Sequence, residues 1–308
     1  MPQNTDWDCI VVGGGAAGLS AALVLGRARL NVLLIDSGGQ SNLPAHGIGG
    51  LLGHDGRPPS ELYALGRKEL AGYPTVELCD GRVVSGERDG DRFLLSLQDG
   101  STEAARRVLL ATGMDYSYPD VPGIAPMWGH SVFHCPFCHG WEARDQALGV
   151  LDGSPNGVHR ALLLKMWSDD VTLLANGPAQ FDGAEAKKLS KAGVAIDVRR
   201  VLRVRGEGDR LSAVEFEDGT SRPLGGLLVP VTLRQRSALA EQLGATYAEA
   251  GPVVANAVQV DPMFRTQVPG LSAAGDASVQ MPSVANAVAA GSNAAAAIVQ
   301  SLVVERYE

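Results

Sequence analysis

The sequence predicts an α/β protein built from two three-layer domains, the second inserted into the first. An apolar strand followed by a small-residue turn and a helix occurs twice, near the N-terminus and again from about residue 147. Glycine contributes 38 of the 308 residues, more than a helical bundle needs. The length also exceeds that of a usual single domain. We place the first domain at residues 1–117 plus 232–308 and the inserted domain at 118–231.

The first strand–turn–helix unit begins at residue 8. Residues 8–12 form a short apolar strand, and the glycine-rich turn after it opens an alanine- and leucine-rich helix that runs to about Arg27. Residues 31–35 predict a buried parallel strand, which ends at Asp36. Strand, tight turn, helix and strand within about 30 residues make a Rossmann-like unit.

The turn of this unit has the spacing of a dinucleotide-binding motif. Its first glycine permits the tight turn, its second lets a pyrophosphate approach the backbone, and its third lets the helix pack on the strand. The helix N-terminus attracts phosphate, and the carboxylate that ends the second strand can accept hydrogen bonds from a ribose. The candidate binding residues are Gly13, Gly15, Ala16, Ala17, Gly18 and Asp36. By itself the motif does not distinguish FAD from NAD.

Apolar runs elsewhere predict the remaining elements. The proline- and glycine-rich segment 116–126 marks a crossing between the domains. The expected strands lie at 106–113, 148–151, 171–174, 227–231 and 253–260, and the expected helices at 158–167 and about 283–304. The two strand–turn–helix units make both domains Rossmann-like dinucleotide-binding folds.

Composition narrows the class of protein. A net charge of −8 and a pI near 5.3 argue against nucleic acid and anionic membranes as partners. The sequence has no run of 18 apolar residues, and its first residues lack the basic and apolar parts of a signal peptide. We therefore expect a cytoplasmic protein. Four cysteines are too few for a disulfide scaffold, so they should be free, metal-bound or catalytic.

Two of the cysteines, Cys135 and Cys138, form a pair separated by two residues. Such pairs exchange electrons readily, because one thiol usually has a lowered pKa. A structural zinc site would need a second pair, which Cys9 and Cys79 do not form, so no metal is expected. His139 follows the pair directly and can accept a proton near neutral pH. His134 precedes it, and either shares this role or is an ordinary loop histidine.

Two distant segments resemble the paired motifs of flavoproteins with two dinucleotide sites. One is Ala111, Thr112 and Gly113, at the end of a predicted strand, and the other is Gly275 with Asp276. In those flavoproteins the C-terminal Gly-Asp contacts the FAD pyrophosphate and ribitol. This resemblance implies that the first dinucleotide site binds FAD.

With the cysteine pair added, the whole chain resembles the low-molecular-weight thioredoxin reductase family. The resemblance implies that Cys138 meets the flavin and that Cys135 exchanges with the dithiol or disulfide substrate. His139 stands where these reductases carry the aspartate that gives and takes protons. Gln40 and Asn42 fall where the family places polar residues that contact the flavin. The family habit also implies a homodimer.

The second nucleotide motif departs from that family. Asp152 and Ser154 replace its first two glycines. A carboxylate there would repel the pyrophosphate, since two like charges at about 4 Å repel by on the order of several kcal/mol. Residues 175–177, Ala-Asn-Gly, replace the basic residues that hold the 2′-phosphate of NADPH. We therefore do not expect productive use of NADPH.

A chain with the Cys-x-x-Cys-His-Gly motif and without these nucleotide motifs resembles the branch of the family that includes FAD-dependent dithiol oxidases. Those enzymes close disulfides in small molecules and pass electrons to O₂. The leading hypothesis is an FAD-dependent dithiol–disulfide oxidoreductase of this type, acting on a small dithiol. One alternative is a thioredoxin reductase that is fed by ferredoxin, another carrier or NADPH and reduces a thioredoxin-like protein. A further alternative, from a different class, is a flavin-bound redox sensor.

Overall fold

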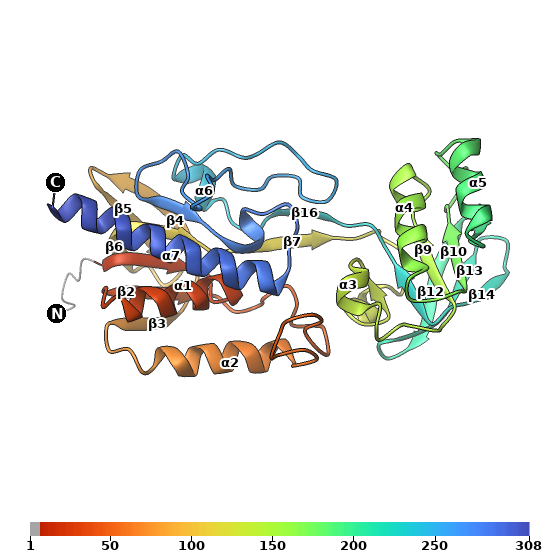
Figure 1. Ribbon diagram of the computed structural model, residues 1–308, viewed down its shortest axis with the longest axis horizontal. Helices are drawn as coiled ribbons and strands as arrows, with labels where there is room; N and C mark the ends of the chain where they lie inside the picture. Colours follow the sequence, from red (N-terminus) through yellow and green to blue (C-terminus); the bar gives the residue numbers. More distant parts are fainter. Residues whose placement is uncertain (1–6, 308) are drawn as a thin grey trace. The chain divides into compact units, whose positions relative to one another are not determined.

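A computed structural model describes residues 7–307, which form two compact units (Figure 1). Unit 1 comprises the described parts of Met1–Leu43, Pro59–Tyr116 and Thr232–Glu308, and unit 2 comprises Pro44–Pro58 and Ser117–Val231. This division differs from the predicted boundaries mainly at residues 44–58, which were predicted to lie in the first domain and belong to unit 2. Gly129 lies against Pro44, and Gly49 lies against the backbone of Cys138.

A seven-stranded sheet forms the centre of unit 1. Its parallel part has the order β3-β2-β1-β6, with β17 also pairing with β6, and the antiparallel hairpin of β4 and β5 continues it beyond β6. The strands are β1 Trp7–Val12, β2 Val32–Asp36, β3 Val76–Asp80, β4 Val83–Asp89, β5 Arg92–Leu97, β6 Thr102–Leu110 and β17 Leu271–Ala273. A two-stranded pair, β7 Met114–Ser117 and β16 Thr232–Gln235, follows the chain into and out of unit 2.

Alternate residues of the central strands face two separate cores. On β1, Cys9 and Val11 pack under the helices, whereas Ile10 and Val12 pack with the β4–β5 hairpin and α6. This alternation is why the strand is apolar throughout. The helices of unit 1 are α1 Ala16–Arg27, α2 Pro59–Leu70, α6 Leu239–Gln242 and α7 Val284–Tyr307, with a short 3₁₀ turn, η2, at Gly275–Ala277.

Helix α7 lies along α1 (Figure 1), and small residues make this packing possible. Gly291 is buried, and a Cβ there would overlap the carbonyl oxygen of Ala17. Among the described residues α7 is the one helix long and apolar enough to cross a membrane. Its buried alanine face against α1 accounts for that composition.

Unit 2 has a five-stranded parallel sheet in the order β11-β10-β9-β15-β8 and an antiparallel sheet in the order β12-β13-β14. The strands are β8 Val132–Phe133, β9 Leu148–Leu151, β10 Val171–Leu174, β11 Ala195–Asp197, β12 Val201–Glu207, β13 Arg210–Phe216, β14 Ser221–Pro223 and β15 Gly226–Leu228. The helices are η1 Ala125–Met127, α3 Pro136–His139, α4 Pro155–Leu164 and α5 Gly183–Lys191. The predicted α/β fold with two Rossmann-like units is confirmed.

The strand predicted at residues 253–260 is wrong. The described backbone of this segment makes single bridges, Leu233 with Val254 and Tyr247 with Val258, rather than a ladder. Its amides donate to several neighbours in turn, since Ala255 donates to Leu233 and Val258 donates to Ala277. The apolar run therefore reflects burial in the core without continuous pairing.

The close packing of α7 on α1 predicts a large cost for any side chain at Gly291. We expect Gly291→Ala to lower the free energy of unfolding by about 1–3 kcal/mol, because the methyl group must displace backbone. Gly183→Ala is the matched control, since it lies in helix α5 with open space around its Cβ position. That control should be neutral or stabilising by about 0.4–1 kcal/mol. Thermal and denaturant unfolding measure both, and equal effects would contradict the packing argument.

Candidate active site

The first glycine-rich turn is tight enough to exclude side chains at two positions. Gly13 has φ +113°, and a Cβ there would overlap the carbonyl oxygen of Ala111. A Cβ at Gly18 would overlap the carbonyl oxygen of Gly13, so helix α1 begins directly against the turn. The structure therefore places the turn beside Ala111, the first residue of the predicted Ala111–Gly113 motif.

Asp36, at the end of β2, holds the turn in place. Its carboxylate is buried and accepts hydrogen bonds from the amides of Gly14, at 3.1 Å, and Gly38, at 3.0 Å. Gln40 also donates to this carboxylate, at 3.2 Å, and to the carbonyl oxygen of Gly14, at 3.3 Å. Of the two residues predicted near the flavin, Gln40 thus lies at the turn.

The second of these residues, Asn42, accepts a hydrogen bond from the Tyr63 hydroxyl at 2.7 Å. Sequence reasoning missed Tyr63 as well as Arg67, whose guanidinium contacts Asp36 at 3.3 Å. Both residues come from α2. This helix carries no recognisable motif, so its sequence does not show that its side chains contact the segment that follows β2.

The C-terminal motif reaches the same helix N-terminus. Gly275 has φ +73°, and its Cβ position would lie 2.8 Å from the Cβ of Ala17. Beside it the Asp276 carboxylate accepts a hydrogen bond from the Tyr116 hydroxyl at 3.2 Å, and burial raises the pKa of Asp276. Sequence reasoning missed Tyr116 because it lies 160 positions away from its partner.

The N-terminus of α1 is suited to an anion. Its N-cap residue is Gly15, and no side chain among the described residues caps it; the first turn also lacks acidic residues. The amide groups there, together with the helix dipole, favour a phosphate group. The three predicted cofactor segments lie together around this helix end, so these residues fit the pyrophosphate of a dinucleotide such as FAD.

The cysteine pair lies in unit 2 at the start of the short helix α3. Cys135 is the N-cap residue and forms a disulfide with Cys138, with the two Cα atoms 5.3 Å apart. The amides of Cys138 and His139 both donate to the Cys135 carbonyl oxygen at 3.2 Å. The helical turn thus holds the two sulfurs at bonding separation, as an exchanging disulfide requires.

The other two cysteines lie outside this disulfide. Burial raises the pKa of Cys9 to about 12, and burial together with nearby carboxylates raises the pKa of Cys79. Because the thiolate is the reactive form, neither thiol is activated as a nucleophile. Both therefore behave as bystanders.

His139 is arranged as a base. Its Nε2 lies 3.0 Å from the Gly129 carbonyl oxygen, which can only accept, so Nε2 carries the proton. Its Nδ1 then has a free lone pair, and this buried atom has no hydrogen-bond partner in the part of the chain that the structure describes. Burial lowers the pKa of His139, so the neutral form, ready to accept a proton, dominates at neutral pH.

His134 is unsuited to that role. Burial, with the neighbouring charges of His139 and Arg160, lowers its pKa to about 4. The ring stacks on Trp128 with the centroids 5.7 Å apart. A base with such a low pKa takes a thiol proton poorly near pH 7. The structure thus favours the interpretation of His134 as a packed, neutral side chain.

The turn after β9, which corresponds to a second nucleotide motif, is filled by its own side chains. The Asp152 carboxylate accepts a hydrogen bond from the Ser154 amide at 2.9 Å, at the start of α4, and forms an ion pair with Arg160 of the same helix. Asn176, in the segment after β10, uses its side chain to accept from the Val201 amide at 2.8 Å. The amide of the α4 N-cap residue is therefore already bonded to a carboxylate, although no side chain caps the first turn of the helix.

Two Rossmann-like units, one with a redox disulfide, define the class of flavin-linked disulfide oxidoreductases. Residues 7–291 match the family described as pyridine nucleotide-disulphide oxidoreductase. The chain is 32% identical over 301 residues to thioredoxin reductase tcpT of Claviceps purpurea (strain 20.1), an alignment that covers 94% of this chain and 92% of that protein.

Solved structures agree. The oxidoreductase from Agrobacterium tumefaciens is 37% identical with a TM-score of 0.91, over 97% of this chain and 99% of that one. The protein HlmI is 38% identical with a TM-score of 0.92, over 98% and 94%. The chain belongs to the pyridine nucleotide-disulphide oxidoreductase family and is of the thioredoxin reductase-like type, which confirms the resemblance seen in the sequence.

The free Nδ1 lone pair of His139 predicts how replacing this residue changes the rate of thiol exchange. We expect His139→Gln to slow reaction of the disulfide with a dithiol by about 10²-fold or more, because no base remains for the incoming thiol. In the unaltered protein the rate should fall at acid pH with a midpoint below the ordinary histidine value of 6.5. This acid limb should vanish in the variant. Anaerobic stopped-flow kinetics across a pH series measure both effects, with His159→Gln, exposed on α4, as control.

Buried neutral His134 predicts acid sensitivity of unit 2. The unfolded chain binds a proton there below pH 6.5, whereas the folded chain does so only below about 4. Stability from this group is therefore complete above pH 6.5 and is lost as the pH falls toward 4, by about 3 kcal/mol in total. We expect His134→Gln to flatten the pH dependence of the unfolding free energy in this window. An unchanged slope would contradict the assignment.

Proposed function

We propose that the protein is an FAD-dependent dithiol–disulfide oxidoreductase that oxidises a small dithiol, passes the electrons to O₂ and does not depend on NADPH. The observation that carries this proposal is the contrast between two equivalent helix ends. Neither helix has a side-chain cap or an acidic residue in its first turn. At α4, however, the amide of the N-cap residue itself, Ser154, donates to the Asp152 carboxylate, which also pairs with Arg160. At α1 the corresponding carboxylate, Asp36, bonds the amide of Gly14, one residue before the N-cap.

Electrostatics explains why that contrast matters. A pyrophosphate at α4 would have to displace Asp152 from the amide of Ser154 or lie beside it. Two like charges 4 Å apart near a protein surface repel by about 4 kcal/mol, roughly a thousandfold in affinity. Because Arg160 offsets the charge of Asp152, this is the upper bound of the effect. Displacement would also break the hydrogen bond from the Ser154 amide and leave the Asp152 carboxylate, which is 8% exposed, with Arg160 as its partner. Either route opposes NADPH binding.

The chain's own residues supply the thiol chemistry. One substrate thiol gives its proton to Nδ1 of His139, and the thiolate attacks Cys135, breaking the Cys135–Cys138 bond and forming a mixed disulfide. The second substrate thiol then attacks the substrate sulfur, so the substrate leaves as a disulfide and both cysteines are reduced. A bound FAD supplies the two-electron acceptor that O₂ reoxidises. The sum is one dithiol plus O₂ giving one disulfide plus hydrogen peroxide.

The surface around the disulfide suits an apolar substrate. Phe137, between the two cysteines, is 70% exposed, and Trp141, one turn further on, is 66% exposed. Phe137 meets the edge of Trp167 with the ring centroids 5.6 Å apart, so its exposed position is fixed by packing. Two exposed aromatic side chains beside a reactive disulfide offer an apolar contact surface to a partner. They support a small apolar dithiol as substrate.

The second candidate is a thioredoxin reductase that sends electrons in the opposite direction, to a thioredoxin-like protein. The name of the Claviceps relative, thioredoxin reductase, favours this candidate. Arg200 lies close to Gly177, with its Cζ 3.9 Å from the Cβ position, and offers a positive charge near the place where a 2′-phosphate would bind. Ferredoxin, another carrier or NADPH would then be the electron source.

Parallel anaerobic titrations of the flavin separate these functions. We expect a dithiol such as dithiothreitol to bleach the visible flavin absorbance and air to restore it, whereas NADPH and NADH leave it unchanged. The Cys135→Ser/Cys138→Ser double variant is the control, and dithiothreitol should fail to bleach its flavin rapidly. Rapid bleaching by NADPH would overturn the proposal and favour the reductase. A flavin that neither NADPH, dithiols nor reduced carriers turn over would instead indicate a redox sensor.

A further inference from the structure

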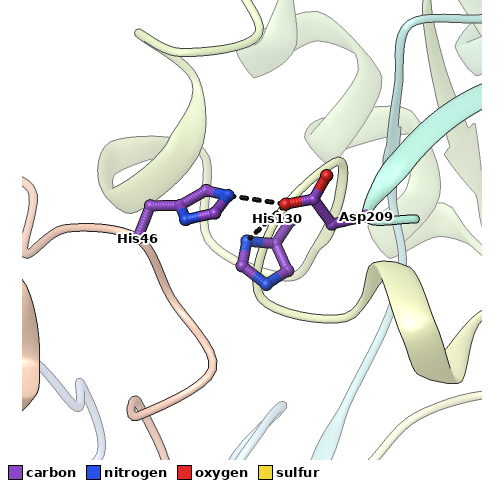
Figure 2. A group of neighbouring side chains, drawn as sticks. All are labelled: His46, His130 and Asp209. Carbon is purple, nitrogen blue, oxygen red and sulfur yellow. Dashed lines mark hydrogen bonds and ion pairs between the residues drawn. The ribbon is translucent and has the colours of Figure 1, made fainter. Parts of the chain in front are cut away.

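Three side chains from separate parts of unit 2 meet at one point (Figure 2). His46 comes from the segment 44–58, His130 from the turn before β8, and Asp209 from the turn between β12 and β13. The Asp209 Oδ2 lies 2.6 Å from Nε2 of His46 and 3.7 Å from Nδ1 of His130. One ligand atom from each residue lies within 4.8 Å of the other two. Two imidazoles and a carboxylate are a common ligand set for zinc.

One atom of this group lacks a partner. The Nδ1 atom of His130 is buried and has no hydrogen-bond partner among residues 7–307, since 3.7 Å to Asp209 is too long for a hydrogen bond. Leaving such a buried polar atom unsatisfied is destabilising. A cation between His130 and Asp209 would accept its lone pair and remove this cost.

The backbone around the group is held in position. The Ser131 hydroxyl donates to the carbonyl oxygen of Asp209 at 2.6 Å and accepts from the Leu211 amide at 2.8 Å. Ser131 therefore ties the residue after His130 to both sides of Asp209. Metal sites depend on supporting hydrogen bonds of this kind to orient their ligands.

The distances fit tetrahedral coordination after a small movement. Bonds of about 2.0–2.1 Å place neighbouring ligand atoms about 3.3 Å apart. The separation of His130 and Asp209 is close to this, and His46 must retreat from Asp209 by less than about 1 Å. The His46 side chain is 77% exposed and can move without disturbing the core. The fourth position remains open to water.

We propose that His46, His130 and Asp209 bind one zinc-type divalent cation, with water as the fourth ligand. The cation joins the segment 44–58 to the β12–β13 turn. In the same segment Gly49 packs on the redox helix, with its Cβ position 2.7 Å from the Cys138 carbonyl oxygen. Metal binding therefore holds this segment against the backbone of the cysteine pair. The cysteine spacing gave no reason to expect a metal, and this site uses no cysteine.

Cobalt titration tests the site directly, because Co²⁺ bound to three protein ligands absorbs visible light and Zn²⁺ displaces it. The protein is used without a histidine tag, in its disulfide form and with Cys79→Ser, so that thiols do not compete. The spectrum of the metal-free protein is subtracted from each spectrum to remove the flavin absorbance. We expect one Co²⁺ per chain, released by one equivalent of Zn²⁺. Absence of saturable binding would overturn the proposal.

Variants locate the binding. His46→Ala, His130→Ala and Asp209→Asn should each weaken Co²⁺ binding by at least about 10-fold. His46→Ala is decisive, because its exposed side chain can be removed without unfolding unit 2. The control is His159→Ala, a surface histidine on α4 that should bind Co²⁺ as the parent does. Equal affinity in His46→Ala and in the parent would mean that His46 and Asp209 form only a surface ion pair.

Discussion

The contact on which unit 1 depends is the approach of backbone to backbone around the first turn of α1. Gly13 meets Ala111, Gly18 meets Gly13, and Gly291 of α7 meets Ala17, each too closely for a side chain. Removing Cβ atoms here lets segments that are hundreds of residues apart converge on one helix end. The N–H groups at that end then form a site suited to an anion. The packing of the fold therefore builds the site that the proposed cofactor would use.

The turn before α4 in unit 2 has the same close approach of backbone to backbone, but it does not offer the same anion site. A Cβ at Gly157 would overlap the carbonyl oxygen of Asp152, just as a Cβ at Gly18 would overlap that of Gly13. The glycine needed to pack α4 on β9 is therefore present. The first residue of the turn is the one that differs, because Asp152 brings a carboxylate that bonds the Ser154 amide and pairs with Arg160. Packing and ligand binding are therefore separable demands on one motif, and the proposal above is that unit 2 meets only the first.

Sequence patterns predicted those elements whose signal is local. The apolar runs of β1, β2, β9 and β10 and the two turns could be recognised because each strand is buried on both faces. The antiparallel strands β4, β5, β12 and β13 escaped, since their exposed faces dilute the apolar pattern. Side-chain partnerships such as Tyr116 with Asp276, or His46 with Asp209, join residues 160 and 163 positions apart. No single-sequence periodicity records such pairs, and they decide the detail of each site.

The direction of electron flow depends on the nucleotide sites more than on the cysteine pair. In the proposed reaction His139, held neutral by burial, would assist a thiol that attacks the disulfide, and by microscopic reversibility the same group would return a proton in the reverse reaction. It therefore speeds both directions and selects neither. The direction of electron flow is therefore set by the molecule that exchanges electrons with the flavin, other than the cysteine pair. An open second site would let NADPH drive reduction of a disulfide. In the function proposed above, the Asp152–Arg160 pair opposes that donor, which would leave the dithiol as the reductant and O₂ as the acceptor.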